Sequence, residues 1–320
     1  MSTTYARAAL PVINLSLLRG SDQDQDTLAR SLEEACLHTG FFYISDHGIP
    51  DELIDRIFRE SRALFDLPEE QKKAIHKAHS HANRGYEPLK SQTLEPGSPP
   101  DLKEGFYIGE ELDGTDPRVQ AGRFNQGPNQ WPTELPTFRD TMTEYFEAMN
   151  ELSDHIMQAL ALSLDLPQDF FEDFCHQPMS TLRLLHYPPQ PPNPSPGEKG
   201  CGAHTDFGGV TILLLDDNPG LQVWEANNEE WLNANPIPGT FVVNMGDMIA
   251  RWTNDRYRST LHRVINTSGA ERYSVPFFYS GNPDHEVSCL SLCLADGDQP
   301  HYPPTTVEAH LMEMYQRTYA

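Results

Sequence analysis

The chain has 320 residues, of which 38% are hydrophobic, and its 47 acidic and 23 basic residues give a net charge of -24. Such a surface repels nucleic-acid phosphates and anionic lipid headgroups. No stretch approaches the roughly 20 apolar residues of a membrane helix, the N-terminal part shows no signal-peptide pattern, and the five cysteines form no CxxC pair. We therefore expect a cytoplasmic protein with reduced thiols and with no nucleic-acid or membrane partner.

The first half of the chain has the apolar spacing of helices. Apolar residues recur every three or four positions, as on one face of a helix, over residues 27–39, from Asp51 onward and over residues 136–164. We expect the last and longest of these helices to pack along the outside of the core. A further helix is expected to begin at Thr305, where Thr305 and Glu308 have the spacing of a capping box.

After Thr181 the sequence changes to short β-rich runs that are separated by turn residues. The predicted strands cover residues 210–215, 221–224, 240–243, 261–267 and 273–279. Helices followed by strands favour one α+β fold, mainly a β core, over a βαβ series. The strand pattern is that of an antiparallel sandwich or barrel, built mainly from residues 180–282.

Three side chains in the second half could bind a metal ion together. His204 and Asp206 are two positions apart, so on a strand they would point to the same side, and His262 could join them from a later strand. Two imidazoles and one carboxylate on one face of an ion leave open positions, as in non-haem Fe(II) oxygenases. A zinc hydrolase is an alternative, although zinc prefers four ligands.

Arg272 and Ser274 form a second pair with this spacing. A guanidinium can bind a carboxylate through two hydrogen bonds, and the serine hydroxyl can add another. This pair predicts a carboxylate ligand near the metal site, without saying which one. A non-catalytic binding protein would need neither the metal ligands nor this pair.

These motifs resemble the 2-oxoglutarate- and Fe(II)-dependent dioxygenases of the isopenicillin N synthase-like group. The resemblance spans nearly the whole chain, and the motifs follow the order of the family. They are residues 10–15 (LPVINL), 40–50 (GFFYISDHGIP), 182–189 (LRLLHYPP), 204–206 (HTD), 243–247 (VNMGD), 262–264 (HRV) and 272–274 (RYS).

The resemblance implies a double-stranded β-helix, or jelly roll, braced by N-terminal and long central helices. Residues 1–120 would be a helical, substrate-shaping region, and residues 121–320 the catalytic core with a C-terminal helix, in one structural unit. His204, Asp206 and His262 would bind Fe(II). Arg272 and Ser274 would hold the distal carboxylate of 2-oxoglutarate, to which Tyr187 would add a hydroxyl.

The resemblance also bears on the residues around the site. At position 185, where plant members often carry an asparagine that can contact the cosubstrate, this chain has Leu185. The residues expected at the substrate pocket are Phe207, Tyr107 and Phe278. Residues 244–247 are interpreted as a turn between strands, with no binding role.

The implied function is oxidation of a small organic molecule in secondary metabolism. O2 would be consumed, 2-oxoglutarate would be decarboxylated to succinate and CO2, and ascorbate would serve as a reductant. Hydroxylation, desaturation and cyclisation are all open, as are the substrate and the oligomeric state. One alternative is an iron oxidase of the same fold that does not use 2-oxoglutarate, and another is a non-catalytic or zinc-binding relative.

Overall fold

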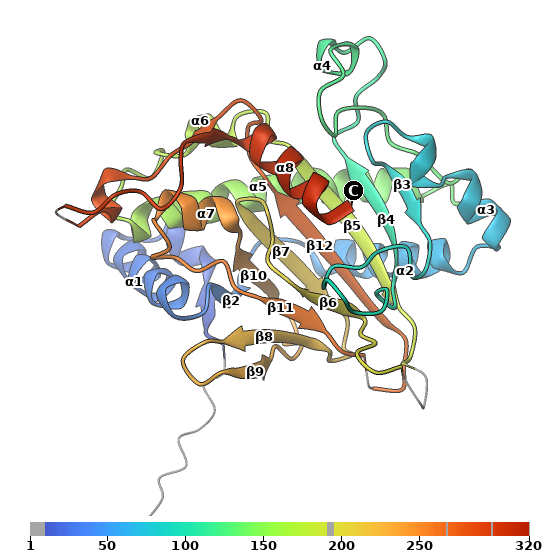
Figure 1. Cartoon of the computed structure of the whole chain (residues 1–320), viewed down its shortest axis with the longest axis horizontal. Helices are drawn as coiled ribbons and strands as arrows, with labels where there is room; N and C mark the ends of the chain where they lie inside the picture. The colour runs from blue at the N-terminus through green and yellow to red at the C-terminus, as the bar shows by residue number, and fades with distance from the viewer. Residues whose placement is uncertain (1–9, 191–194, 267, 296, 320) are drawn as a thin grey trace, which may run out of the picture.

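The computed structural model describes residues 10–190, 195–266, 268–295 and 297–319, in which two β-sheets face each other (Figure 1). The large sheet has eight strands, in the spatial order β1 (Val12–Asn14), β2 (Phe41–Ser45), β10 (Phe241–Met245), β7 (Val210–Leu215), β12 (Arg272–Tyr279), β5 (Ser180–Tyr187), β4 (Glu104–Gly109) and β3 (Gly85–Glu87). The small sheet has four, in the order β6 (Cys201–His204), β11 (His262–Val264), β8 (Leu221–Glu225) and β9 (Glu230–Asn233). Strands β13 (Glu286–Val287) and β14 (Thr305–Thr306) form a separate pair.

The long helices α1 (Asp22–His38), α2 (Asp51–Phe65) and α5 (Phe138–Ser163) cover the large sheet on the side away from the small one. In chain order the helices are α1 (Asp22–His38), α2 (Asp51–Phe65), α3 (Glu69–Ala74), α4 (Pro117–Gln120), α5 (Phe138–Ser163), α6 (Glu172–Cys175), α7 (Asp247–Trp252) and α8 (Val307–Tyr319). Three short 3-10 helices lie at Leu15–Arg19, Lys77–His79 and Ser291–Cys293. The fold is the predicted α+β jelly roll with bracing helices, so the predicted fold class is confirmed.

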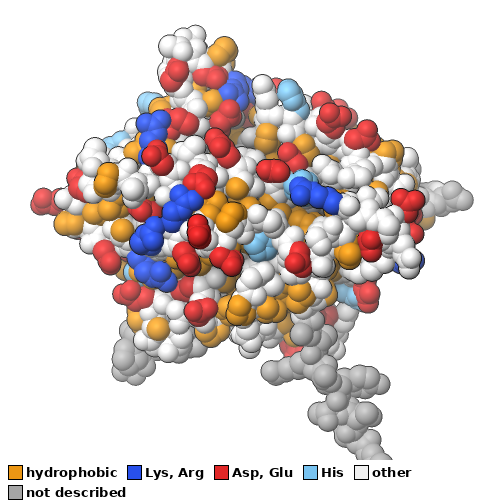
Figure 2. Space-filling model, turned by 180° about the vertical axis from the view of Figure 1, so that it is seen from behind, with side chains coloured by type: hydrophobic (Ala, Val, Ile, Leu, Met, Phe, Trp, Pro, Cys, Tyr) orange, Lys and Arg blue, Asp and Glu red, His pale blue; other side chains and the backbone are white. Residues whose placement is uncertain are grey.

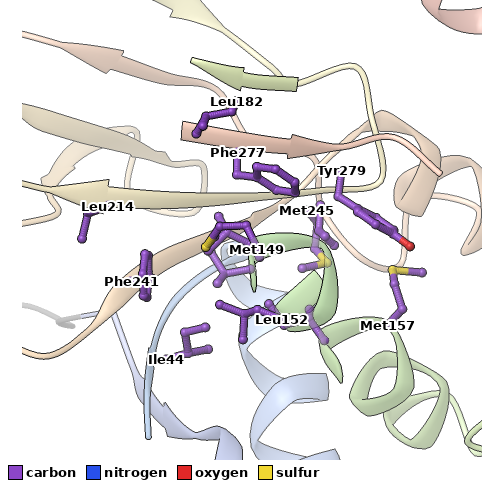
Figure 3. Close-up of a cluster of buried hydrophobic side chains, with 14 of the residues drawn as sticks. Ile44, Met149, Leu152, Met157, Leu182, Leu214, Phe241, Met245, Phe277 and Tyr279 are labelled. Carbon is purple, nitrogen blue, oxygen red and sulfur yellow. The ribbon is translucent and has the colours of Figure 1, made fainter. Parts of the chain in front are cut away.

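The long helix α5 packs where the sequence predicts it. Figure 3 shows Met149, Leu152 and Met157 of this helix in one cluster with side chains of the large-sheet strands β2, β5, β7, β10 and β12, among them Leu182 and Phe277. All five side chains are at most 2% exposed. Burial of this apolar face stabilises the fold by about 25 cal/mol for each Å² removed from water, so α5 anchors the back of the sheet.

The two faces of the large sheet differ because side chains alternate along each strand. On β5, Leu182 and Leu184 belong to the core cluster under the helices, whereas Leu185 and Tyr187 belong to the cluster between the sheets. That second cluster also contains Val223 from the small sheet. Residues of β5, β7, β10 and β12 that alternate with the helix-facing ones therefore point between the sheets, where the site lies.

Several predicted boundaries were wrong. Helix α1 begins at Asp22 instead of residue 27, because Ser21 caps it through a reciprocal hydrogen-bond pair with Asp24. Of the strand predicted over residues 261–267, residues 261–266 are described and only the three residues of β11 form a strand; residue 267 lies outside the described residues.

The predicted capping box at the last helix was also wrong. Thr305 and Thr306 lie in β14, and the Thr306 hydroxyl accepts a hydrogen bond from the Ala309 N–H (3.3 Å). The Glu308 carboxylate accepts instead from the Phe124 N–H (3.0 Å) and pairs with Arg123 (2.7 Å). Helix α8 is thus joined to a distant segment by the residue that was expected to cap it.

The surface agrees with the acidic composition. Figure 2 shows one face, on which acidic side chains are spread among basic, hydrophobic and neutral ones. Among the helices that the structure describes, none has both the length and the apolar character needed to span a bilayer.

Candidate metal centre and active site

The small sheet brings the three predicted metal ligands together. His204 is the last residue of β6, His262 is the first of β11, and the two are direct partners in the antiparallel pair. Asp206 lies two residues beyond the end of β6, so the strand spacing used for its prediction does not strictly apply. The Nε2 atoms of His204 and His262 lie 3.8 and 3.7 Å from Asp206 Oδ1. Each of the three residues offers one potential ligand atom, and these three atoms all lie within 4.8 Å of one another.

Hydrogen bonds to backbone carbonyls fix which imidazole nitrogen faces the centre. His204 Nδ1 lies 2.8 Å from the Gly202 carbonyl oxygen, and His262 Nδ1 lies 3.2 Å from that of Thr260. Since a carbonyl only accepts, Nδ1 carries the proton in each ring and Nε2 keeps its lone pair. Both lone pairs are thus available to an ion on the Asp206 side, the arrangement typical of histidine ligands.

Two donors hold Asp206. Its Oδ2 atom accepts hydrogen bonds from the Thr211 hydroxyl (2.7 Å) and the Asn244 side-chain amide (2.8 Å). These bonds orient the carboxylate and direct Oδ1 toward the two imidazoles. The interpretation of residues 244–247 as a turn without a binding role was therefore wrong for Asn244, which is buried within β10.

The protonation states suit a divalent cation. Burial lowers the pKa of His204 and, with the neighbouring His204 ring, lowers the pKa of His262 to about 4. Burial alone would raise the pKa of Asp206, but both histidines and the Thr211 and Asn244 hydrogen bonds hold it below its usual value. At neutral pH the centre thus presents two neutral imidazoles and one carboxylate. This donor set and its one-sided geometry fit Fe(II).

The predicted carboxylate clamp lies between the sheets on β12 and β5. Arg272 is 1% exposed and Ser274 is 2% exposed. Arg272 pairs in register with Tyr187, and its guanidinium carbon lies 4.9 Å from the Tyr187 ring centroid. Burial raises the pKa of Tyr187, whereas the neighbouring Arg272 guanidinium and the Ser274 side chain act to lower it.

The Arg272 guanidinium has the donors that a carboxylate would need. Its Nε and Nη1 atoms are buried and have no hydrogen-bond partner among the described residues. A buried cation with unmet donors is costly unless an anion meets it. The residues present therefore fit the distal carboxylate of 2-oxoglutarate.

A cavity of about 80 Å³, partly open to solvent, adjoins the metal centre. Its lining residues are Leu94, Asn125, Met179, Thr181, Arg183, His204, Thr205, Asp206, Phe207, Gly208, Phe278, Ser280, Leu311 and Tyr315. Two of the predicted pocket residues, Phe207 and Phe278, are in this lining. The third, Tyr107, is not, but its hydroxyl accepts a hydrogen bond from Arg183 directly behind the wall.

Sequence reasoning missed Arg183, although it lies within the motif at residues 182–189. The sequence did contain an indication of it. Arg183 is a charged residue between Leu182 and Leu184, and it alternates with them so that it shares the inner face of β5 with Leu185 and Tyr187.

Comparison with known proteins identifies the family. Residues 10–134 match a family described as non-haem dioxygenase in morphine synthesis N-terminal, and residues 178–281 match the 2OG-Fe(II) oxygenase superfamily. The chain is 46% identical over 319 residues to the 2-oxoglutarate-Fe(II) type oxidoreductase hxnY of Emericella nidulans, covering 98% of this chain and 91% of that one. It is 40% identical to a 2-oxoglutarate-Fe(II) type oxidoreductase of Aspergillus fumigatus, with coverages of 96% and 93%.

A solved structure agrees with this result. The crystal structure of a full-length Neurospora crassa protein in complex with alpha-KG superimposes with a TM-score of 0.87 at 29% identity, covering 98% of both chains. The chain belongs to the 2OG-Fe(II) oxygenase superfamily. It is a 2-oxoglutarate-dependent dioxygenase, an oxidoreductase whose His204, Asp206 and His262 hold Fe(II).

Proposed function

We propose that this oxygenase hydroxylates, desaturates or cyclises a small organic molecule and couples that reaction to decarboxylation of 2-oxoglutarate to succinate and CO2. The observation that carries the proposal is the position of the cavity, which has His204 and Asp206 in its wall. A small molecule in this cavity would lie beside the metal. The similar Neurospora crassa protein was also crystallised with a small molecule beside the cosubstrate in the same crystal, namely with alpha-KG and thymine.

Each group of site residues would have its own role in this reaction. Bound iron supplies oxidising power from O2 when the keto acid is decarboxylated. His204, Asp206 and His262 hold the ion from one side, and the Asn244 and Thr211 hydrogen bonds keep the carboxylate in place. Arg272, Ser274 and Tyr187 would orient 2-oxoglutarate from the inner faces of β12 and β5. A substrate bound in the cavity would exclude water from the reacting groups.

We also propose that residues 1–120 shape the substrate side of the site, and that residues 121–320 form the catalytic core and C-terminal helix of the same unit. Leu94 from the first part lines the cavity, and Tyr107 supports Arg183. Secondary metabolism remains the expected setting of the reaction, with ascorbate as the expected reductant.

The test is to load the protein with Fe(II) under anaerobic conditions, add 2-oxoglutarate, admit O2 and measure O2 uptake and succinate. We expect slow succinate formation without substrate, faster formation with substrate, and neither in Asp206→Ala. O2 uptake without succinate would instead support an iron oxidase that does not use 2-oxoglutarate. Absence of both would favour a non-catalytic or zinc-binding protein.

A further inference from the structure

We infer that the substrate of the proposed oxygenase reaction is a small carboxylic acid in its anionic form, held in the cavity by Arg183. This inference rests on the proposed function, since it assigns the substrate class of the same site. It follows from the place of Arg183 on β5, from the charges packed around it and from the character of the cavity walls.

Arg183 is too far from the 2-oxoglutarate clamp to belong to it. Arg183 and Tyr187 are four positions apart on β5, which corresponds to about 13 Å along an extended strand. The Arg272 guanidinium lies beside Tyr187, whereas Arg183 lines the cavity together with His204 and Asp206. The space between the sheets therefore has one cation at the substrate end, Arg183 on β5, and another at the cosubstrate end, Arg272 on β12.

Arg183 shares an acidic neighbour with a second cation. One Glu87 oxygen lies 2.7 Å from Lys77 Nζ, and the other lies 3.6 Å from Arg183 Nη2. Burial would raise the pKa of Glu87, but Arg183 and Lys77 hold it below its usual value, so the carboxyl is ionised at neutral pH. In the cluster Lys77–Glu87–Arg183, two cationic side chains thus face one carboxylate. The Arg183 side chain is only 11% exposed, so water screens little of its charge and an anion in the cavity would be attracted to it.

Neighbouring groups hold the Arg183 guanidinium at the cavity wall. Its carbon lies 4.2 Å from the Tyr107 ring centroid and 5.8 Å from that of Phe278. The Tyr107 hydroxyl accepts from Arg183 and donates to Glu87 (2.6 Å). Contacts of this kind fix the plane of a guanidinium, which is the condition for two-pronged binding of a carboxylate.

The remaining walls indicate the rest of the substrate. Phe207, Phe278 and Tyr315 contribute aromatic rings, and Leu94, Met179 and Leu311 add further apolar side chains. Thr181 and Ser280 add hydroxyls. Such a cavity suits a compact apolar or aromatic body, with its carboxylate on Arg183 and a C–H group directed toward the metal.

The experiment compares acids with their matched neutral amides. The probes are 4-methylbenzoate with 4-methylbenzamide, and cyclohexanecarboxylate with cyclohexanecarboxamide. Binding to the anaerobic protein carrying Fe(II) and 2-oxoglutarate is followed by the change in the visible absorption of the complex, and succinate release is measured after O2 is admitted. We expect each acid to bind at least tenfold more tightly than its amide. Equal or weaker binding of the acids in both pairs would overturn the inference.

Charge variants separate this role from a structural one. Arg183→Gln should weaken acid binding about 10- to 100-fold, while amide binding changes less than threefold. Glu87→Gln should tighten acid binding several-fold, because it removes the competing carboxylate. If both variants weaken acids and amides alike, the cluster only supports the fold and the inference fails.

The affinity for 2-oxoglutarate is the internal control. Arg183→Gln should leave it within about twofold, and a parallel loss would place Arg183 in the cosubstrate site, against the inference. Failure of the proposed function is distinguishable, because it would appear as absence of succinate in the unmodified protein. The anaerobic comparison of acids with amides would still measure the preference for anions.

Discussion

Replacement of Arg272 by lysine tests the assignment of the cosubstrate site. The side chain is 1% exposed and two of its guanidinium nitrogens lack hydrogen-bond partners among the described residues. Lysine keeps the positive charge but cannot present two parallel N–H donors to one carboxylate. Iron binding should survive, because Arg272 lies on β12 of the large sheet, whereas both histidine ligands come from the small sheet.

The expected loss follows from the bond that lysine cannot make. A hydrogen bond to a charged group contributes about 1.5–3 kcal/mol, so the loss of one prong should weaken 2-oxoglutarate binding by about 10- to 150-fold. Arg272→Met should bind 2-oxoglutarate more weakly still. It should nevertheless raise the free energy of unfolding of the protein without cosubstrate, because a buried, unpaired charge is replaced by an apolar chain.

The assay is a titration of the anaerobic Fe(II) protein with 2-oxoglutarate, followed by the visible charge-transfer band of the complex. Arg256→Lys is a matched control, since Arg256 has a side chain 40% exposed and contacts Glu33 on α1. The control should keep its midpoint. An unchanged midpoint in Arg272→Lys would refute the assignment of this residue to the cosubstrate.

Of three further predictions, two concern the metal centre and one concerns the buried His310 of α8. His262→Ala should abolish retention of one Fe(II) per chain and O2-dependent turnover, and turnover at the parent rate would contradict the ligand assignment. Asn244→Leu should weaken iron binding about 10- to 100-fold in an anaerobic iron titration, because Asp206 loses a donor that orients it; unchanged affinity would show that Thr211 alone suffices. His310 is 5% exposed, and burial lowers its pKa from 6.5 to about 4. The unfolded chain therefore binds a proton that the folded chain excludes between these pH values, and stability falls as the pH drops through them. In urea unfolding His310→Gln should flatten that fall by up to about 3 kcal/mol, and an unaltered slope would contradict it.

The sequence was sufficient to predict the metal ligands because their pattern is partly local. His204 and Asp206 are two positions apart, and His262 lies in a recognisable later motif. Their support by Asn244 was not predicted, because the residues that follow it resemble a turn. Alternation along β10 would have indicated it: Val243 faces the helices, so Val242 and Asn244 face the site.

Other errors arose where a distant contact decides the local structure. Thr305 and Glu308 have the spacing of a capping box, yet Glu308 pairs with Arg123, which is 185 positions away in the chain. A local pattern contains no information on such a partner. The same limit applies to Arg183, because its proposed role in binding an anion depends on Lys77 and Glu87 from the N-terminal part.

The position of Leu185 between Arg183 and the Arg272 clamp explains how an apolar residue there affects ligand binding. It lies on the inner face of β5, two residues from Arg183 and two from Tyr187, and is 7% exposed within an apolar cluster. A polar residue here, as the plant relatives often have, could offer a hydrogen bond to a ligand at either end. An apolar one keeps the dielectric constant between the two sites low and offers no such bond. Under the proposed assignment, Arg183 binds the carboxylate of the substrate and Arg272 binds that of 2-oxoglutarate. A ligand that binds at the other ligand's site therefore leaves one buried guanidinium without a carboxylate partner.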